Sequence, residues 1–147
     1  MRHLILPCIF FSVLTTFGQK TAPASVSENP FFQPWQGTDA LFPFDKIKVS
    51  HLRSALDSGL VLMKNTYADI IANRAKPTPK NTLWAANFDK GFDLISKAMT
   101  VTYILNSTDA TPETQKLMQE YYVKYTEAQN EFTYSAAYFQ KIEELHR

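Results

Sequence analysis

The chain has 147 residues, of which 45% are hydrophobic and 20% are charged. This composition is that of an ordinary folded domain and excludes a disordered tail. The formal net charge is +1, and no basic block exceeds two residues, so the concentrated basic face of a nucleic-acid-binding protein is missing. Aromatic residues make up 14% of the chain, which is ample material for a hydrophobic core.

Residues 1–18 have the layout of a secretory signal peptide. A short positive start precedes 14 mostly apolar residues from Leu4 to Phe17, and Gly18 is a small residue at the expected cleavage point. A run of this length is too short to cross the ~30 Å hydrocarbon core of a bilayer. We therefore predict a periplasmic or secreted protein that has no membrane association after signal cleavage.

The only cysteine, Cys8, lies inside the predicted signal peptide. It follows Pro7 rather than a small residue, which excludes a lipoprotein signal. Cleavage after Gly18 would leave a chain with no thiol and no disulfide, held together by packing alone. Loss of Arg2 would lower the basic count from 15 to 14, equal to the 14 acidic residues, so the mature domain is expected to be close to neutral.

Two non-periodic segments follow. Residues 19–28 are small and polar, and they predict a flexible leader. Residues 29–44 contain prolines that forbid a continuous helix. Because the same segment is rich in large apolar side chains, it predicts an irregular aromatic strap that lies across a larger body, through Phe31, Phe32, Trp35, Leu41, Phe42 and Phe44.

The remainder predicts an all-α fold with about four helices. The first is expected over roughly Val49 to Asn73, with Ser50 as its N-cap. Pro77 and Pro79 stop any further helix. Its inward stripe follows steps of three and four residues, as a 3.6-residue period requires: Leu52, Leu56, Leu60, Met63, Tyr67 and Ile70.

A second helix is expected to begin near Asn81 or Thr82 and to end at residues 106–109. Gly91 lies within it and weakens it by ~1 kcal/mol relative to alanine. Its expected inward stripe is Phe88, Phe92, Ile95 and Met99, with an extension to Tyr103.

The third helix has the clearest start, because Thr111 can act as N-cap, Pro112 fits the first helical position and Glu113 favours the positive end of the dipole. Its expected inward residues are Met118, Tyr122, Tyr125 and either Ala128 or Phe132. Ser135 is expected to cap a fourth helix that runs to Arg147 without a C-cap glycine, as if cut in mid-element. The inward residues of this helix are expected to be Tyr138, Phe139, Ile142 and Leu145.

Four short motifs occur in order along residues 29–147. They are Asn-Pro-Phe-Phe at 29–32, Pro-Phe-Asp-Lys-Ile-Lys at 43–48, Pro-Thr followed by Asn-Thr within 77–82, and the Tyr-Phe pair at 138–139. In order and spacing they resemble the N-terminal region of peptidyl-dipeptidases, also called dipeptidyl carboxypeptidases, of the thimet oligopeptidase-like zinc metallopeptidase family. Residues 79–80 and the segment 33–40 depart from the family pattern, which leaves the subtype open.

The resemblance implies that residues 29–147 are an incomplete N-terminal lobe of a clam-shell helical peptidase, truncated before its catalytic domain. In such enzymes a His-Glu-x-x-His helix and a further Glu hold one zinc, and the zinc-bound water attacks the peptide carbonyl. The resemblance implies that the intact protein hydrolyses short peptides and releases C-terminal dipeptides. These residues would form part of the channel wall, with the missing catalytic domain and short peptides as partners.

The zinc motif itself is missing from this chain. It needs two histidines at positions i and i+4 of one helix, and the histidines here are His3, His51 and His146. Glu143 to His146 offers one histidine and predicts an ordinary solvated helix end. We therefore expect no catalytic, cofactor-binding or metal-binding residue in this chain, and no peptidase activity of this chain alone.

Other catalytic arrangements lack a necessary member. His51 is close in sequence to Ser50 and Ser54, but a nucleophile and its base need a third group to orient them. His51 is therefore expected to be exposed in a first helical turn. Glu143 and Glu144 are expected to be a charged surface pair, because an acid-base dyad needs an apolar site that separates their pKa values.

The tyrosines leave two interpretations open. Tyr122, Tyr125 and Tyr138 could line a peptide channel together with Tyr121 and Tyr134, but residues at helical spacing more often pack, and we predict core or inter-helix packing for the first three. The alternative to a peptidase region is a free-standing secreted helical module that binds a protein or peptide without catalysis. A third possibility is an unrelated secreted helical bundle.

Overall fold

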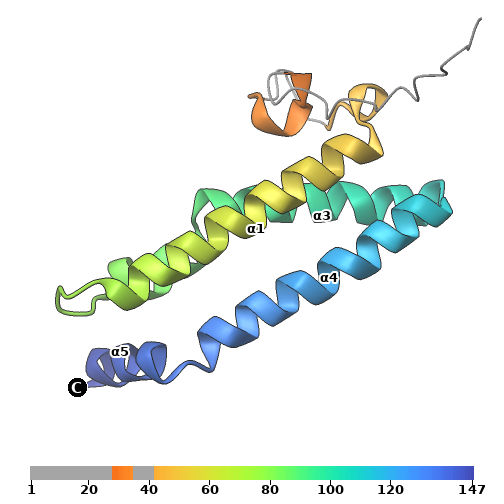
Figure 1. Cartoon of the computed structure of the whole chain (residues 1–147). Coiled ribbons are helices and arrows are strands. Elements are labelled where there is room, and N and C mark those ends of the chain that lie inside the picture. The colour runs from red at the N-terminus through yellow and green to blue at the C-terminus, as the bar shows by residue number, and fades with distance from the viewer. Residues whose placement is uncertain (1–27, 35–41) are drawn as a thin grey trace, which may run out of the picture.

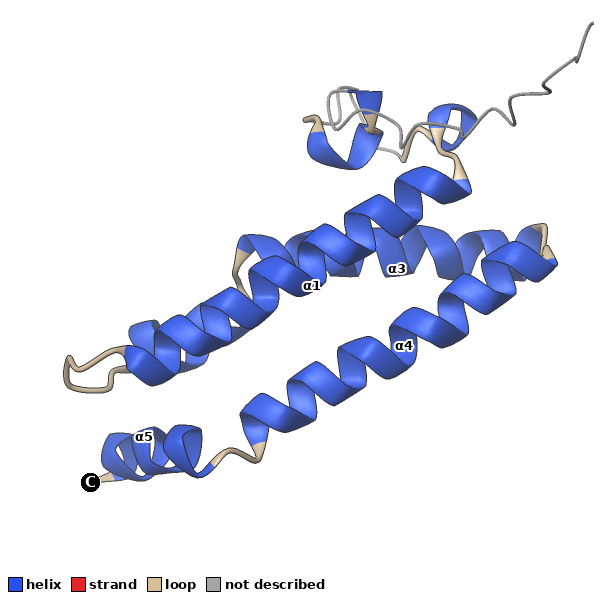
Figure 2. Ribbon diagram, viewed as in Figure 1, coloured by secondary structure: helices blue, strands red, loops and turns tan. Residues whose placement is uncertain are grey.

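A computed structural model describes residues 28–34 and 42–147, and every regular element in these ranges is helical. Its long helices are α1 (Val49–Ala72), α3 (Lys90–Thr108) and α4 (Pro112–Thr133), and α5 (Ala136–His146) lies at the C-terminal end (Figure 1). Figure 2 shows the same arrangement coloured by secondary structure. The predicted all-α fold is confirmed. None of the described helices is long and apolar enough to cross a bilayer. The predicted signal peptide, nearly all of the leader, and Trp35 and Leu41 of the strap lie outside the described residues.

Helix α1 is the central element and packs most extensively on α3. All six residues of its predicted stripe are buried, which confirms the period-based assignment. Its N-cap position is Lys48, so the prediction of Ser50 as cap is wrong. The first turn is instead closed by His51, whose Nδ1 accepts a hydrogen bond from the Lys48 N–H at 3.3 Å.

The link between α1 and α3 is helical but broken. One π-helical turn, η4 (Pro79–Trp84), and the short helix α2 (Ala85–Asn87) precede α3. Thr78 caps η4, because its Oγ1 accepts from the Asn81 N–H at 3.2 Å while Asn81 Oδ1 accepts from the Thr78 N–H at 2.8 Å. The predicted start at Asn81 or Thr82 is therefore wrong. The predicted continuous second helix is interrupted before Asp89, whose Oδ1 accepts from the Phe92 N–H at 2.6 Å and caps α3.

Two glycines set the close approach of α1 and α3. A Cβ atom added at Gly91 would lie 2.4 Å from the backbone N of Met63 and 2.8 Å from the Gly59 carbonyl oxygen. A Cβ atom added at Gly59 would lie 2.6 Å from Ile95 Cγ1. Gly91 weakens an isolated helix, but here the missing side chain allows the two backbones to come into contact.

In the first half of α4 the buried face lies one residue earlier than predicted, whereas Ala128 and Phe132 are buried as predicted. Leu117 and Tyr121 are its most buried large side chains, whereas Met118 is only partly buried and Tyr122 is 61% exposed. The inward assignment of Tyr122 is therefore wrong. The predicted start is confirmed, since Thr111 Oγ1 accepts from the Thr114 N–H at 3.2 Å. Polar contacts of Tyr121 with α1, described below, give the physical reason for this register.

Helix α5 begins as predicted, with Ser135 Oγ accepting from the Tyr138 N–H at 3.2 Å. Tyr138 is buried, but Phe139 is 66% exposed, so its inward assignment is wrong. Lys141 Nζ donates to the Asn73 carbonyl oxygen at 2.6 Å. This contact places a cation at the carboxyl end of α1, where the helix dipole favours positive charge.

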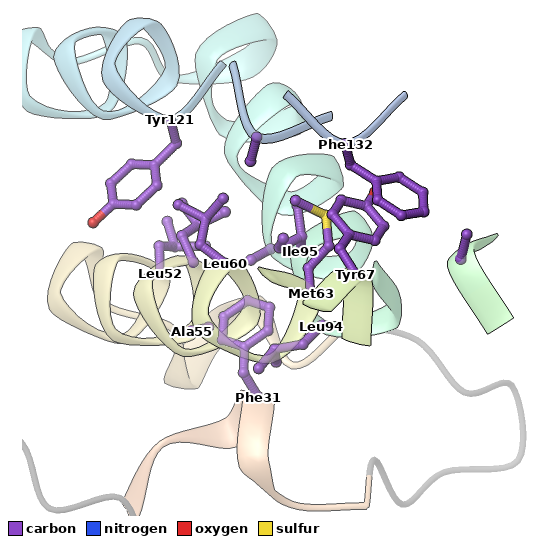
Figure 3. Close-up of a cluster of buried hydrophobic side chains, with 14 of the residues drawn as sticks. Phe31, Leu52, Ala55, Leu60, Met63, Tyr67, Leu94, Ile95, Tyr121 and Phe132 are labelled. Atoms are coloured by element: carbon purple, nitrogen blue, oxygen red, sulfur yellow. The ribbon is translucent and has the colours of Figure 1, made fainter. Parts of the chain in front are cut away.

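The start of the strap lies against the helices as expected. Phe31, in the short 3-10 turn η2 (Pro30–Phe32), is buried, and η2 contacts both α1 and α3. Figure 3 shows the Phe31 ring reaching the core beside Ala55 and Leu94. A second 3-10 turn, η3 (Phe44–Lys46), leads into α1, and Phe44 is exposed. The strap prediction is thus confirmed at Phe31 and not at Phe44.

Candidate functional site

His51 is buried, at 5% exposure, so the expectation of an exposed histidine is wrong. The first turn of α1 is not fully solvated, because the strap contacts α1 there. The strap residue Asn29 donates from Nδ2 to the His51 carbonyl oxygen at 2.9 Å, and its Oδ1 accepts from the Phe31 N–H at 3.1 Å. His51 therefore has a structural role here, and no hydrogen bond joins it to Ser50 or Ser54 in the described region.

The replacement Asn29→Ala is expected to lower the free energy of unfolding by about 1–3 kcal/mol, because it leaves the buried partners of Asn29 unsatisfied. Asn87→Ala is a matched control, since Asn87 Nδ2 also bonds a carbonyl oxygen, that of Leu83, but is exposed. Urea denaturation of both variants measures the difference. Equal effects of the two substitutions would show that the strap is not anchored through Asn29.

The candidate site residues near the C-terminal end of the described chain lie at the surface. Glu143 is exposed and pairs with Arg147 at 2.7 Å, and Glu144 and His146 are exposed, so the predicted surface pair of glutamates is confirmed. Within residues 28–34 and 42–147, no group of three His, Cys, Asp or Glu side chains could hold a metal ion. The described residues therefore do not fit a zinc site, and no catalytic step through zinc can be assigned to them.

Tyr121 is the centre of a polar cluster that joins α4 to α1. Its hydroxyl donates to Asp57 Oδ1 at 2.5 Å, and Arg53 Nη1 lies 3.0 Å from Glu120 Oε2. Lys124 Nζ contacts Glu120 Oε1 at 2.6 Å and lies 4.6 Å from the centroid of the Tyr121 ring. Of these residues only Tyr121 was named from the sequence, as a tyrosine that could line a channel. The contacts between α1 and α4 have no sequence signal, because they join residues more than 60 positions apart.

The electrostatics of this cluster favour a structural role. Burial and then the hydrogen bond to Asp57 raise the pKa of Tyr121 above its ordinary value. The contacts of Glu120 with Lys124 and then Arg53 lower the pKa of that carboxyl group. The phenol thus stays protonated and the carboxylate stays ionised, which suits a fixed set of hydrogen bonds rather than proton transfer.

A stack of three aromatic rings joins α1, α4 and α5. Tyr67 and Phe132 lie parallel with centroids 4.0 Å apart, and Phe132 is tilted against Tyr138 at 4.1 Å. The packing prediction for Tyr138 is confirmed. Tyr125 is partly buried, and its hydroxyl accepts a hydrogen bond from Gln129 Nε2 at 2.8 Å.

Stability is expected to fall in alkaline solution because burial raises the pKa of Tyr67 from 10.0 to about 12. A raised folded-state pKa favours the protonated phenol, so its stabilisation is complete below about pH 10 and is lost as the pH rises through about 12. Urea denaturation of wild type and Tyr67→Phe at about pH 9 and about pH 11.5 tests this expectation. The variant should lose less stability over this interval, and a loss equal to that of wild type would contradict it.

Two surface features remain as candidates for binding. One is a groove between α1 and α4, made of hollows of about 350 and 540 Å³ that share Lys64, Ala128 and Glu131. The other is a second apolar face of α3, where Phe92 and Met99 border a hollow of about 250 Å³ with Tyr122 and Tyr125 of α4. No charged side chain lines this second hollow.

The second face explains why the predicted stripe of this segment was partly wrong. Ile95 is buried and Phe92 and Met99 are partly buried, but Phe88 is 81% exposed and Tyr103 is also exposed. The buried residues of α3 are instead Gly91, Leu94, Ile95, Ala98, Val101 and Thr102. Helix α3 is therefore apolar on more than the face that α1 covers.

No family model matches the chain, and no curated protein matches it.

Proposed function

We propose that residues 29–147 form the N-terminal channel-wall region of a longer helical zinc metallopeptidase that hydrolyses short peptides and releases C-terminal dipeptides. The catalytic residues and the zinc belong to the remainder of that protein. The role of this region is to shape the substrate channel and to exclude folded proteins. The chain by itself is inactive, and the protein is periplasmic or secreted.

The observation that carries this proposal is a set of exposed aromatic side chains on η4, α3 and α4 and in the link between α2 and α3. Phe88 is 81% exposed and Tyr122 is 61% exposed, while Trp84 and Tyr103 are also exposed. Large apolar patches on a folded protein are typical of surfaces that bind another protein surface. A catalytic domain that packs on these side chains would remove them from water.

The positions of the four family-like motifs support the same proposal. Asn29 and Phe31 of the first motif anchor the strap to α1. The second motif, residues 43–48, leads directly into α1. Thr78 and Asn81 of the third form the reciprocal cap of η4, and residues 138–139 of the fourth lie in the first turn of α5. Each motif thus occupies a junction where local sequence determines the path of the chain.

The proposal is tested by the mass and activity of the native product. A product several times heavier than 16.8 kDa that releases C-terminal dipeptides, loses activity with a chelator and regains it with zinc would support the proposal. The purified 147-residue chain should show no such activity. A native product no longer than this chain would overturn the proposal and favour a free-standing binding module.

A further inference from the structure

The groove between α1 and α4 is open along its length and has a largely apolar floor. The helices are held together by the Tyr121–Asp57 contact toward one end of the groove and by the Tyr67–Phe132 stack toward the other. Its lining runs along α1 from Asp57 to Ile71, which are 14 positions apart, or ~21 Å at 1.5 Å per residue. Val61 is 59% exposed within it.

Charged residues along the two edges of this groove are unevenly paired. Lys124 contacts Glu120, but Glu127 and Glu131 on α4 form no salt bridge within the described residues, and neither does Lys64 on α1. The α4 edge therefore presents two carboxylates without a salt bridge. The α1 edge presents the Lys64 ammonium group and the Asp57 carboxylate, which accepts the Tyr121 hydroxyl but forms no salt bridge within the described residues. An occupant gains most if it brings basic side chains to α4 and an acidic one to Lys64.

We propose that this groove binds an amphipathic helix of a separate polypeptide, with apolar side chains on the groove floor and basic side chains along the α4 edge. A helix suits the site because ~21 Å corresponds to about four helical turns, and the exposed floor residues lie along one side of α1. No described segment of the chain fills the groove. The proposal uses only α1 and α4, so it is independent of the proposed peptidase function.

Two synthetic peptides test the charge preference directly. Both carry the same leucine and alanine stripe over about four turns, but one has lysines and the other has glutamates at the positions that would face α4. Titration of the labelled peptides with the full chain, followed by fluorescence anisotropy at low salt, should show at least about tenfold tighter binding of the basic peptide. Added salt should reduce this preference, because it screens exposed charges.

Variants of the protein locate the binding. The double variant Glu127→Gln with Glu131→Gln should remove most of the charge preference, while Glu144→Gln on the exposed face of α5 should leave it unchanged. Val61→Glu should abolish binding of both peptides without unfolding, since Val61 is already largely exposed, and circular dichroism checks the fold. Equal affinity for the two peptides, no binding of either, or binding unaffected by Val61→Glu would overturn the proposal.

Sedimentation of the chain alone tests the other possible occupant of the groove, which is a second copy of the same chain. If the chain forms dimers that Val61→Glu dissociates, and the basic peptide does not compete with them, the groove is an interface between copies and the proposal is wrong. A monomer that binds the basic peptide supports it.

Discussion

The replacement Phe132→Ala is expected to lower the free energy of unfolding by about 3–5 kcal/mol, the usual loss for removing a buried phenylalanine. Phe132 is the middle ring of the stack with Tyr67 and Tyr138. Its loss removes the apolar contact that joins α1, α4 and α5, and it opens a cavity that the neighbouring helix backbones can fill only in part. Urea denaturation followed by circular dichroism measures the change.

The matched control is Phe139→Ala on α5. Phe139 is the same residue type but is 66% exposed, so its truncation should change stability by less than about 0.5 kcal/mol. A larger loss at Phe139 than at Phe132 would show that α5 packs with the opposite face. That result would also contradict the ring stack.

The replacement Gly91→Ala is expected to destabilise the protein by about 2 kcal/mol, even though alanine is the better helix former. A methyl group at this position would lie 2.4 Å from the Met63 backbone N and 2.8 Å from the Gly59 carbonyl oxygen. Overpacking of this kind costs about 1–3 kcal/mol and more against rigid backbone, while the gain in helix propensity returns about 1 kcal/mol. Helices α1 and α3 must move apart to accept it.

Two further variants should cost less stability than Gly91→Ala and serve as comparisons. Gly59→Ala should cost less than Gly91→Ala, because its closest new contact is the side-chain atom Ile95 Cγ1, which can shift. Lys90→Ala, at an exposed neighbouring position, should change stability by less than about 0.5 kcal/mol. Stabilisation by Gly91→Ala would show that the two helices do not approach closely at this point.

Helix α1 shows how much a strong apolar period determines. Its stripe is regular over six positions, so the buried face follows from the sequence whatever packs against it. The N-caps Thr111 and Ser135 were also predicted correctly, because a cap is a contact between residues three positions apart. Such local features do not depend on the rest of the fold.

Helix α4 shows where the sequence is ambiguous. Tyr121 and Tyr122 are adjacent and chemically identical, so the pattern could not tell which one faces inward. Asp57 and Arg53 of α1 decide the matter, because they offer the Tyr121 hydroxyl a hydrogen bond acceptor and a nearby cation. The partners are distant in sequence, and only the assembled helices bring them together.

The positions of the three histidines in the sequence exclude a His-Glu-x-x-His motif. The structural role of His51, in contrast, could not be predicted from the sequence. His51 accepts a hydrogen bond at its carbonyl oxygen from Asn29, which is 22 residues away in the chain. The groove between α1 and α4 could not be predicted from the sequence either, because it depends on how far apart the two helices pack.

The sequence by itself determined the helical class, the buried face of α1 and the caps of α4 and α5, because these depend on short-range periodicity and on hydrogen bonds within one turn. The tertiary structure decided the register of α4, the burial of His51, the glycine contact and the uncovered faces. These depend on contacts between distant segments, and such contacts select among arrangements that local sequence leaves nearly equal in energy.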